Sequence, residues 1–357
     1  MKILVVATTP YPLFFRPILK EKVWGGRNLA RLGKILPKDA LIGESWELAD
    51  LPETVAQGQS VIANGAWTGM TLREAIAQRP EAIMGTPTAP KGGFPLLIKF
   101  LDARENLSLQ VHPNDAFVRR HPHTHPKSEA WVVLRAEPGA VIYKGLKPHV
   151  TRKNLARHIA TGAVIDDLCS IEVRVGDCHY LPSGTCHALG AGIVVAEIQT
   201  PSDTTFRVYD WGRSGRRLHV DEALESISFG LPPPPAPKPG RPVEVGGLRT
   251  TPLVKTDFFA IQRIEALADT SLPIVTSGMP VVWMVLAGGG RINTPDAEPV
   301  DVATGRTVLL PAELAGSVAR LTESSVLLVV TLPSPIEGLL AKETPPRGQK
   351  SPKSPGL

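Results

Sequence analysis

Four side chains of the kinds that bind divalent metals fall within one part of the sequence. Gln110 and His112 are two residues apart, Glu129 opens the next apolar run, and His187 follows a tight turn further on. Side chains two residues apart in a strand face the same side, so Gln110, His112 and Ser108 are expected on one strand face. Amide, imidazole and carboxylate groups are typical metal ligands, and together the four residues predict one divalent metal site.

The elements that must position these side chains are mostly strands. Residues 42–48 and 94–101 are predicted strands, and the second is apolar except for Lys99. An alternating pattern typical of strands then continues through Val208. Within it Glu197 stands on a face where an apolar residue would be routine, which marks it as a candidate functional residue.

Helical signals are few. Thr71 and Glu74 have the spacing of a capping box and predict a helix that runs to about Met84. Residues 217–229 are also predicted to be helical. The fold expected from these patterns is mainly β, with a small helical insertion in its N-terminal half.

Composition divides the chain into four segments. An N-terminal domain is expected over residues 1–230 and a second β-rich domain over residues 244–335. Between them, residues 231–243 are rich in proline and predict a semi-rigid linker. Residues 336–357 have the composition of a disordered tail.

Charge and hydropathy exclude several classes of protein. The formal net charge is only +5, and no run of Lys and Arg is interleaved with aromatic residues, so a nucleic-acid partner is not expected. No apolar run is long enough to cross a bilayer, and the N-terminus lacks a convincing signal peptide, so we expect a cytoplasmic protein. Cys169, Cys178 and Cys186 are odd in number and clustered, which argues against a disulfide framework.

A degenerate repeat relates the two β-rich parts. Residues 131–134 recur as 283–286, and the spacing Gly-x5-Pro at residues 176–182 recurs at residues 305–311. Counted along this repeat, Glu129 falls opposite Val281 and His187 falls opposite Gly316. The second copy therefore keeps the pattern of the fold but lacks two of the metal ligands, and a metal is expected in the first copy only.

Several motifs resemble those of a known family. Residues 176–187 fit the second cupin motif, in which Gly, five residues and Pro-x-Gly precede a histidine. Gln110-Val-His112 replaces the usual His-x-His of the first motif, and sixteen residues separate it from Glu129. This alteration resembles type I phosphomannose isomerases, in particular the short bacterial form with two cupins. Further segments similar to that family are residues 17–26, 43–47, 97–103 and 197–213.

The resemblance implies a fold, a cofactor and an activity. The fold would be two cupin (jelly-roll) β-barrels, and one Zn²⁺ per chain would be bound by Gln110, His112, Glu129 and His187. The enzyme would interconvert mannose 6-phosphate and fructose 6-phosphate through a cis-enediol, with Arg207, Glu197 and Lys127 as catalytic residues. Lys127 and Ser108 would lie near the substrate phosphate. Apart from the resemblance, Trp24 is a candidate for stacking on the sugar, although core packing is the commoner role of a tryptophan.

Alternatives remain open at this point. Two histidines and one carboxylate also suit Fe(II) in a cupin oxygenase, and a cupin regulator could bind a sugar phosphate without turning it over. A second metal site could be formed by His121, His123 and His125. The intervening prolines prevent a regular strand or helix face, however, and favour a solvated loop. A monomer or a weak homodimer is expected, with a small-molecule substrate as the only partner.

Overall fold

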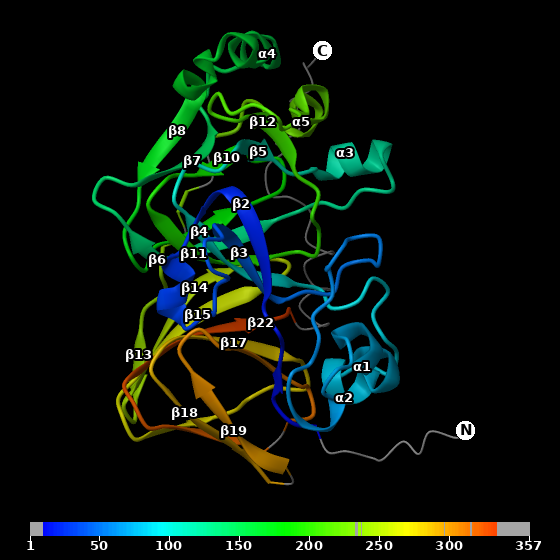
Figure 1. Ribbon diagram of the computed structural model, residues 1–357, viewed down its shortest axis with the longest axis vertical. Coiled ribbons are helices and arrows are strands. Elements are labelled where there is room, and N and C mark those ends of the chain that lie inside the picture. The colour runs from blue at the N-terminus through cyan, green and yellow to red at the C-terminus, as the bar shows by residue number, and fades with distance from the viewer. Residues whose placement is uncertain (1–9, 233–234, 237, 296, 315, 334–357) are drawn as a thin grey trace, which may run out of the picture.

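Four antiparallel β-sheets are stacked along the long axis of the molecule (Figure 1). The computed structural model describes residues 10–232, 235–236, 238–295, 297–314 and 316–333. The predicted tail, residues 336–357, lies outside the described residues, as do three residues of the predicted linker. The expectation of a mainly β fold is confirmed. No helix in the described ranges is long and apolar enough to cross a membrane.

The upper pair of sheets contains the predicted metal ligands. One sheet has the strand order β2-β3-β4-β11-β6-β9, and the other has the order β12-β5-β10-β7-β8. An apolar cluster that includes Trp131, Leu189 and Val195 fills the space between them. The strands are β2 (Ile18–Gly26), β3 (Ile42–Leu48), β4 (Leu97–Ala103), β5 (Leu109–Val111), β6 (Glu129–Ala136), β7 (Val141–Leu146), β8 (Leu168–Glu172), β9 (Cys178–Leu181), β10 (His187–Leu189), β11 (Ile193–Gln199) and β12 (Phe206–Tyr209).

The lower pair of sheets is formed mainly by the C-terminal part of the chain. Its larger sheet has the order β1-β20-β17-β22-β15-β14-β13, and its smaller sheet has the order β16-β21-β18-β19. The strands are β1 (Leu13–Phe14), β13 (Val243–Val245), β14 (Leu248–Lys255), β15 (Ala260–Ala266), β16 (Thr270–Pro273), β17 (Val281–Ala287), β18 (Gly289–Thr294), β19 (Ala297–Ala303), β20 (Thr307–Leu310), β21 (Val318–Leu321) and β22 (Ser325–Thr331).

The two pairs of sheets share a hydrophobic core. Buried side chains of the upper pair, such as Ile98 and Val132, belong to the same cluster as Phe259 and Leu328 of the lower pair. In addition, strand β1 near the N-terminus pairs with β20. The division into domains at residues 230 and 244 stays a prediction, and the packing shows that the two halves are not joined by the linker alone.

The helices lie outside the sheets. α1 (Leu72–Gln78) begins with the predicted capping box of Thr71 and Glu74. The predicted single helix to Met84 is wrong in one respect, because Pro80 ends α1 and starts α2 (Pro80–Met84). The remaining helices are α3 (Asp115–Arg120), α4 (Arg152–Thr161), α5 (Val220–Ser226), and the 3₁₀ helices η1 (Asn28–Leu32), η2 (Gly65–Trp67) and η3 (Ala163–Asp167). α4 and α5 cover the outer face of the five-stranded sheet (Figure 1).

Candidate metal centre and active site

Three of the predicted metal ligands converge inside the upper pair of sheets. Oε2 of Glu129 lies 3.2 Å from Nε2 of His112, and Oε1 of Glu129 lies 3.2 Å from Nε2 of His187. All three side chains are almost completely buried. The amide nitrogen of Gln110 lies 3.3 Å from Nε2 of His187, because β5 and β10 pair with these two residues opposite each other. The sequence-predicted ligands therefore come together from β5, β6 and β10.

Backbone carbonyl groups orient both imidazole rings. Nδ1 of His187 lies 2.8 Å from the carbonyl oxygen of Thr185, and Nδ1 of His112 lies 3.1 Å from that of Thr204. A carbonyl oxygen can only accept, so Nδ1 of each ring carries the hydrogen and Nε2 presents a lone pair to the interior. Burial, followed by the neighbouring Lys127 ammonium, lowers the pKa of His112 to about 3, which keeps this ring neutral. A neutral ring is the form that binds a metal.

The carboxylate of Glu129 fits a bound cation. Neither of its oxygens accepts a hydrogen bond of good geometry from the described part of the chain, although the side chain is fully buried. Burial alone would raise the pKa of Glu129, but Lys127 and His112 hold it well below the ordinary value. A buried charged carboxylate needs a positive partner, and the two imidazoles whose Nε2 lone pairs face it complete a donor set that suits a divalent metal.

Lys127 lies directly on this cluster. Its Nζ is 3.0 Å from Oε2 of Glu129 and 3.1 Å from Nε2 of His112, and the side chain is buried. We expected this residue near the substrate phosphate. That role stays a prediction; in the structure the ammonium group lies against a predicted metal ligand, so a metal and Lys127 would compete for the same carboxylate oxygen.

A cavity of about 410 Å³ opens beside the cluster. Every predicted site residue that is not a buried ligand contributes to its wall; these are Trp24, Ser108, Gln110, Lys127, Glu197 and Arg207. Gln110 and Lys127 connect the cavity to the ligands, since both touch the buried triad. The volume is in the range of small-molecule sites, and the arrangement gives a polar cavity with a candidate metal centre at one side.

Comparisons with known proteins agree with this arrangement. The family model for the phosphomannose isomerase type I catalytic domain matches residues 13–138. The mannose-6-phosphate isomerase of Streptococcus mutans is 35% identical over 306 residues, which cover 84% of this chain and 92% of that protein. This chain belongs to the mannose-6-phosphate isomerase family. ManA, the mannose-6-phosphate isomerase of Bacillus subtilis, is likewise 35% identical over 270 residues, 74% of this chain and 82% of its own length.

The fold also matches solved structures of the family. The crystal structure of the mannose 6-phosphate isomerase from Bacillus subtilis superposes with a TM-score of 0.80 and 28% sequence identity. The match covers 89% of this chain and 99% of that one. The fold expected from the cupin motifs is therefore that of known mannose-6-phosphate isomerases.

A network of buried charges forms one wall of the isomerase cavity. Nζ of Lys99 lies 2.8 Å from Oε1 of Glu197 and 3.8 Å from Oε2 of Glu44, and it donates to Oε1 of Gln199 at 2.7 Å. Nε1 of Trp131 donates to the other oxygen of Glu197 at 2.9 Å. Glu197 thus forms an ion pair with Lys99 through Oε1 and accepts a hydrogen bond from Trp131 through Oε2, while Oε1 accepts no hydrogen bond of good geometry from the described residues.

The titration of this network follows from the same contacts. Burial alone would raise the pKa of Glu44, but Lys99 and Lys22 lower it to about 2. Burial alone would also lower the pKa of Lys99, yet Glu197 and Glu44 raise it above the ordinary lysine value. Glu44 and Lys99 therefore stay charged at neutral pH. The sequence shows Lys99 as the one charged residue of a predicted apolar strand. Its ion pairs with Glu44 and Glu197 could not be predicted from the sequence.

Arg207 reaches the cavity from β12. Its backbone pairs with Gln110, and one guanidinium NH donates to the carbonyl oxygen of Arg217 at 2.7 Å. Nε is buried without a hydrogen bond in the described part of the chain. Burial, then the positive charge of Arg216, lowers the pKa of Arg207. Asp210 makes its hydrogen bonds with Arg213 and Arg216, and its negative charge also acts on Arg207.

The other predicted residues have simpler surroundings. Trp24 is buried in the apolar cluster between the two upper sheets and also lines the cavity, so core packing accounts for most of its surface. Ser108 is buried at the cavity wall. His121 stacks on Phe117 and lies near Glu225, and His123 is exposed. Within the described residues, the one grouping of His, Cys, Asp and Glu with metal-site spacing is His112, Glu129 and His187.

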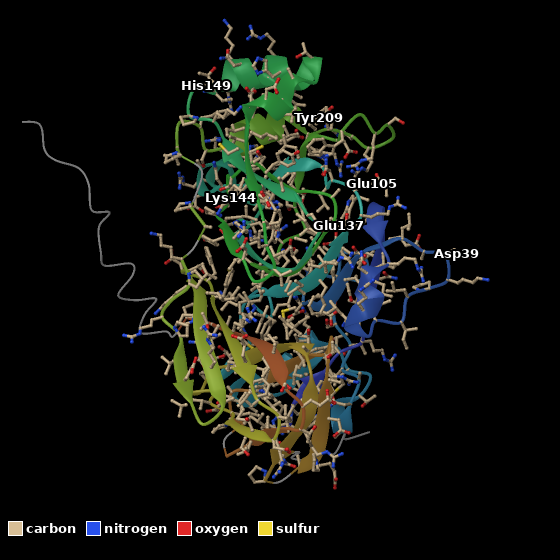
Figure 2. All side chains as sticks on the ribbon, turned by 90° about the vertical axis from the view of Figure 1, so that its left-hand side faces the viewer. Asp39, Glu105, Glu137, Lys144, His149 and Tyr209 are labelled. Carbon is tan, nitrogen blue, oxygen red and sulfur yellow. The ribbon has the colours of Figure 1, made fainter. Side chains whose placement is uncertain are left out.

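Two further buried polar side chains, Lys144 and His179, lie on strands that pair with those of the candidate metal ligands. Neither was predicted from the sequence. Lys144, which pairs with His187 across β7 and β10, is fully buried and donates to the carbonyl oxygen of Pro235 at 3.2 Å. Neither ring nitrogen of the buried His179 has a hydrogen bond to the described residues. Figure 2 shows Lys144 among the side chains of the upper sheets, whereas Asp39 and His149 project at the edge of the molecule.

Proposed function

We propose that this chain interconverts mannose 6-phosphate and fructose 6-phosphate. The observation that carries the proposal is the buried His112, Glu129 and His187 cluster beside a polar cavity of about 410 Å³. In the open-chain sugar, the reaction removes the proton on C2, forms a cis-enediol, and returns a proton to C1 while the carbonyl moves from C1 to C2. Such a reaction needs groups that move protons and groups that stabilise the oxygen on which negative charge develops.

The charges of the cavity support a phosphorylated substrate. Six cations line it, against the three carboxylates of Glu44, Glu197 and Asp203; the cations are Lys20, Lys22, Lys99, Lys127, Arg207 and Arg216. A wall with excess positive charge raises the local concentration of an anionic substrate and favours its binding. Lys127 and Ser108 are proposed contacts of the sugar phosphate, and Trp24 contributes an apolar surface to the same wall.

The proposed cofactor is one Zn²⁺ ion. Gln110, His112, Glu129 and His187 would hold it, and the inward-facing Nε2 lone pairs and the charged Glu129 carboxylate support this assignment. The metal would act as a Lewis acid that polarises and orients the sugar oxygens. Two neutral histidines, a neutral amide and one carboxylate match the donor preferences of zinc.

Arg207, Glu197 and Lys127 are the proposed catalytic residues. A guanidinium stays protonated and donates in a fixed plane, so Arg207 is suited to stabilise the enediolate oxygen. Lys99 and Trp131 hold the side chain of Glu197 in place. Glu197 would contribute a negative charge to a cavity wall that otherwise carries mostly cations. Lys127 would leave Glu129 when the metal binds, since the two positive charges repel each other, and its ammonium would then be available to the substrate.

An assay on the purified, zinc-loaded protein tests the proposal. We expect turnover of mannose 6-phosphate to fructose 6-phosphate, about one zinc per chain by elemental analysis, and no oxygen uptake with Fe(II). Oxygen uptake would identify a cupin oxygenase, and sugar-phosphate binding without turnover would identify a regulator. A monomer or weak homodimer, and a cytoplasmic location, remain predictions for sedimentation and fractionation experiments.

A further inference from the structure

A second, larger cavity lies at the junction of the two sheet pairs. Its volume is about 570 Å³, and its walls come from the segments 14–19, 32–35 and 303–307 together with Glu47 and Ala63. Binding sites for small molecules occur preferentially at such junctions and have volumes in this range. None of the residues assigned above to the metal, the substrate or the reaction lines this cavity.

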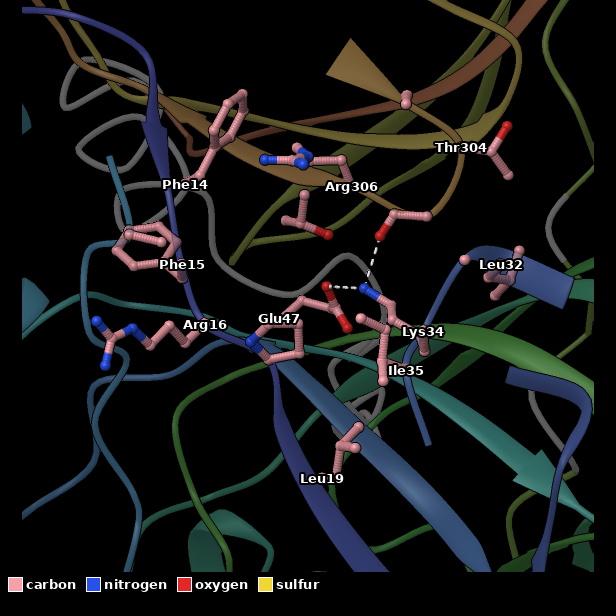
Figure 3. Close-up of a pocket in the computed structure, with 16 residues that line it drawn as sticks. Phe14, Phe15, Arg16, Leu19, Leu32, Lys34, Ile35, Glu47, Thr304 and Arg306 are labelled. Atoms are coloured by element: carbon pink, nitrogen blue, oxygen red, sulfur yellow. Dashed lines mark hydrogen bonds and ion pairs between the residues drawn. The ribbon is translucent and has the colours of Figure 1, made fainter. Parts of the chain in front are cut away.

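A buried ion pair forms the floor of the junction cavity. Nζ of Lys34 lies 2.6 Å from Oε2 of Glu47 and donates to the carbonyl oxygen of Gly305 at 2.6 Å (Figure 3). The second oxygen of Glu47 accepts from Ser45 at 2.6 Å. The charge of Glu47 is thus balanced by Lys34, and each of its oxygens already has a partner.

Arg306, on the opposite wall, is a cation without a hydrogen bond or ion pair in the described residues, although the charge of Asp301 lies close enough to interact with it. Its guanidinium lies 4.5 Å from the centre of the Phe14 ring, which holds the planar group in one orientation. The described residues provide no hydrogen bond or ion pair for this side chain, and Asp301 nearby is paired with Arg291 at 2.6 Å. Figure 3 shows Arg306 facing the Lys34 and Glu47 pair, whereas Arg16 extends away from it.

A buried hydroxyl adds a second polar group without a partner. Oγ1 of Thr307 has no hydrogen bond in the described part of the chain, although only 4% of this residue is exposed and it lines the junction cavity. Buried polar groups in native proteins are almost always hydrogen-bonded, so an unsatisfied one requires an explanation. Arg306 next to it in sequence supplies a planar fork of donors that matches a carboxylate or a phosphate.

We propose that the junction cavity binds a small organic anion. The carboxylate or phosphate head would accept hydrogen bonds from Arg306, and the Thr307 hydroxyl would bind a polar group of the ligand. The apolar side chains of Leu19 and Leu32 would contact its body. Strand β3 separates this site from the isomerase cavity, because Glu47 faces the junction cavity while Glu44 and Trp46 face the other one.

Isothermal titration of the zinc-loaded full-length chain tests this site. The probes are glycerol 3-phosphate, glycerate and glycerol, which share a three-carbon body and differ in the head group. We expect the wild-type chain to bind at least one of the two anions and not glycerol. Arg306→Gln should weaken that binding about tenfold or more, since it removes a charge-assisted bidentate contact.

Two further variants distinguish the loss of this binding site from a general change in charge or stability. Arg119→Gln removes the charge of another exposed arginine, outside the junction cavity, and should leave the titration unchanged. Thr307→Val should weaken binding without lowering the melting temperature, because the lost hydroxyl has no partner in the described residues. The proposal is overturned if no probe binds, if glycerol binds as well as the anions, or if Arg306→Gln binds like the wild type.

Discussion

The ammonium of Lys127 lies 3.0 Å from Oε2 of Glu129, inside the set of proposed zinc ligands. A positive side chain and a metal ion cannot both be accommodated at this carboxylate without strong repulsion. Lys127 would therefore compete with a metal bound at the proposed site, and metal binding would depend on the position of this side chain.

Replacing Lys127 should strengthen zinc binding. In Lys127→Met, a side chain of similar length lacks the competing charge, and we expect zinc affinity to rise at least about tenfold, which a screened charge near the metal would account for. Competition with a chromophoric chelator measures the affinity. Lys91→Met, at an exposed position, is the matched control. Weaker zinc binding in Lys127→Met would show that Lys127 supports the site rather than competing for it.

The same residue should also affect substrate selection. Once released from Glu129, Lys127 can act as a point charge toward a phosphate. Lys127→Ala should therefore reduce kcat/KM for mannose 6-phosphate more than for mannose, mainly through KM. Equal losses on the two sugars would remove Lys127 from phosphate recognition.

Loss of Arg207 should reduce turnover without affecting the metal. We expect Arg207→Ala to lower kcat about a hundredfold or more, the usual cost of losing one donor to a developing oxyanion. Arg207→Lys should restore activity only in part, because lysine lacks the planar fork. Zinc content and melting temperature are measured on the same preparation. A folded, zinc-loaded Arg207→Ala enzyme with near-normal kcat would exclude a catalytic role.

Removing Lys99 should destabilise the protein. Lys99→Met leaves the carboxylate of Glu197 buried without its cation, whereas Glu44 keeps its ion pair with Lys22, and breaking a buried pair in this way costs roughly 3–5 kcal/mol. Urea denaturation measures the loss. The double variant Lys99→Met, Glu197→Gln should recover part of it, since the stranded charge is gone. A double variant no more stable than the single one would contradict this account.

His179 should make the protein sensitive to acid. Burial, followed by the Lys144 ammonium, lowers the pKa of His179 to about 4, whereas the unfolded chain has a value of about 6.5. Between these two values the unfolded chain binds more protons, so the free energy of unfolding falls as the pH falls from about 6.5 toward about 4. His179→Leu should lose less stability over this window than the wild type, as measured by melting temperature. The exposed His149→Gln is the control, and equal slopes in all three proteins would rule out His179.

Much of the site chemistry could be predicted because it depends on local spacing. Gln110 and His112 share a strand face for any strand that contains them, and the capping box of Thr71 and Glu74 is made within a single turn. A break at Pro80, which ends α1, also follows from local sequence, since a proline inside a helical pattern favours one. The motif around His187 indicated the cupin fold through its resemblance to the second cupin motif.

Only the tertiary structure decided which distant side chains meet. Lys99 contacts Glu44 and Glu197, and Lys34 contacts Gly305. Each of these contacts joins residues that lie far apart in the sequence. The same holds for the pairing of β1 with β20, which follows from the shared core of the two halves. The sequence by itself determined the kinds of ligand and their strand faces. Sheet register and the packing between sheets decided their neighbours, because those contacts depend on the whole core and not on local spacing.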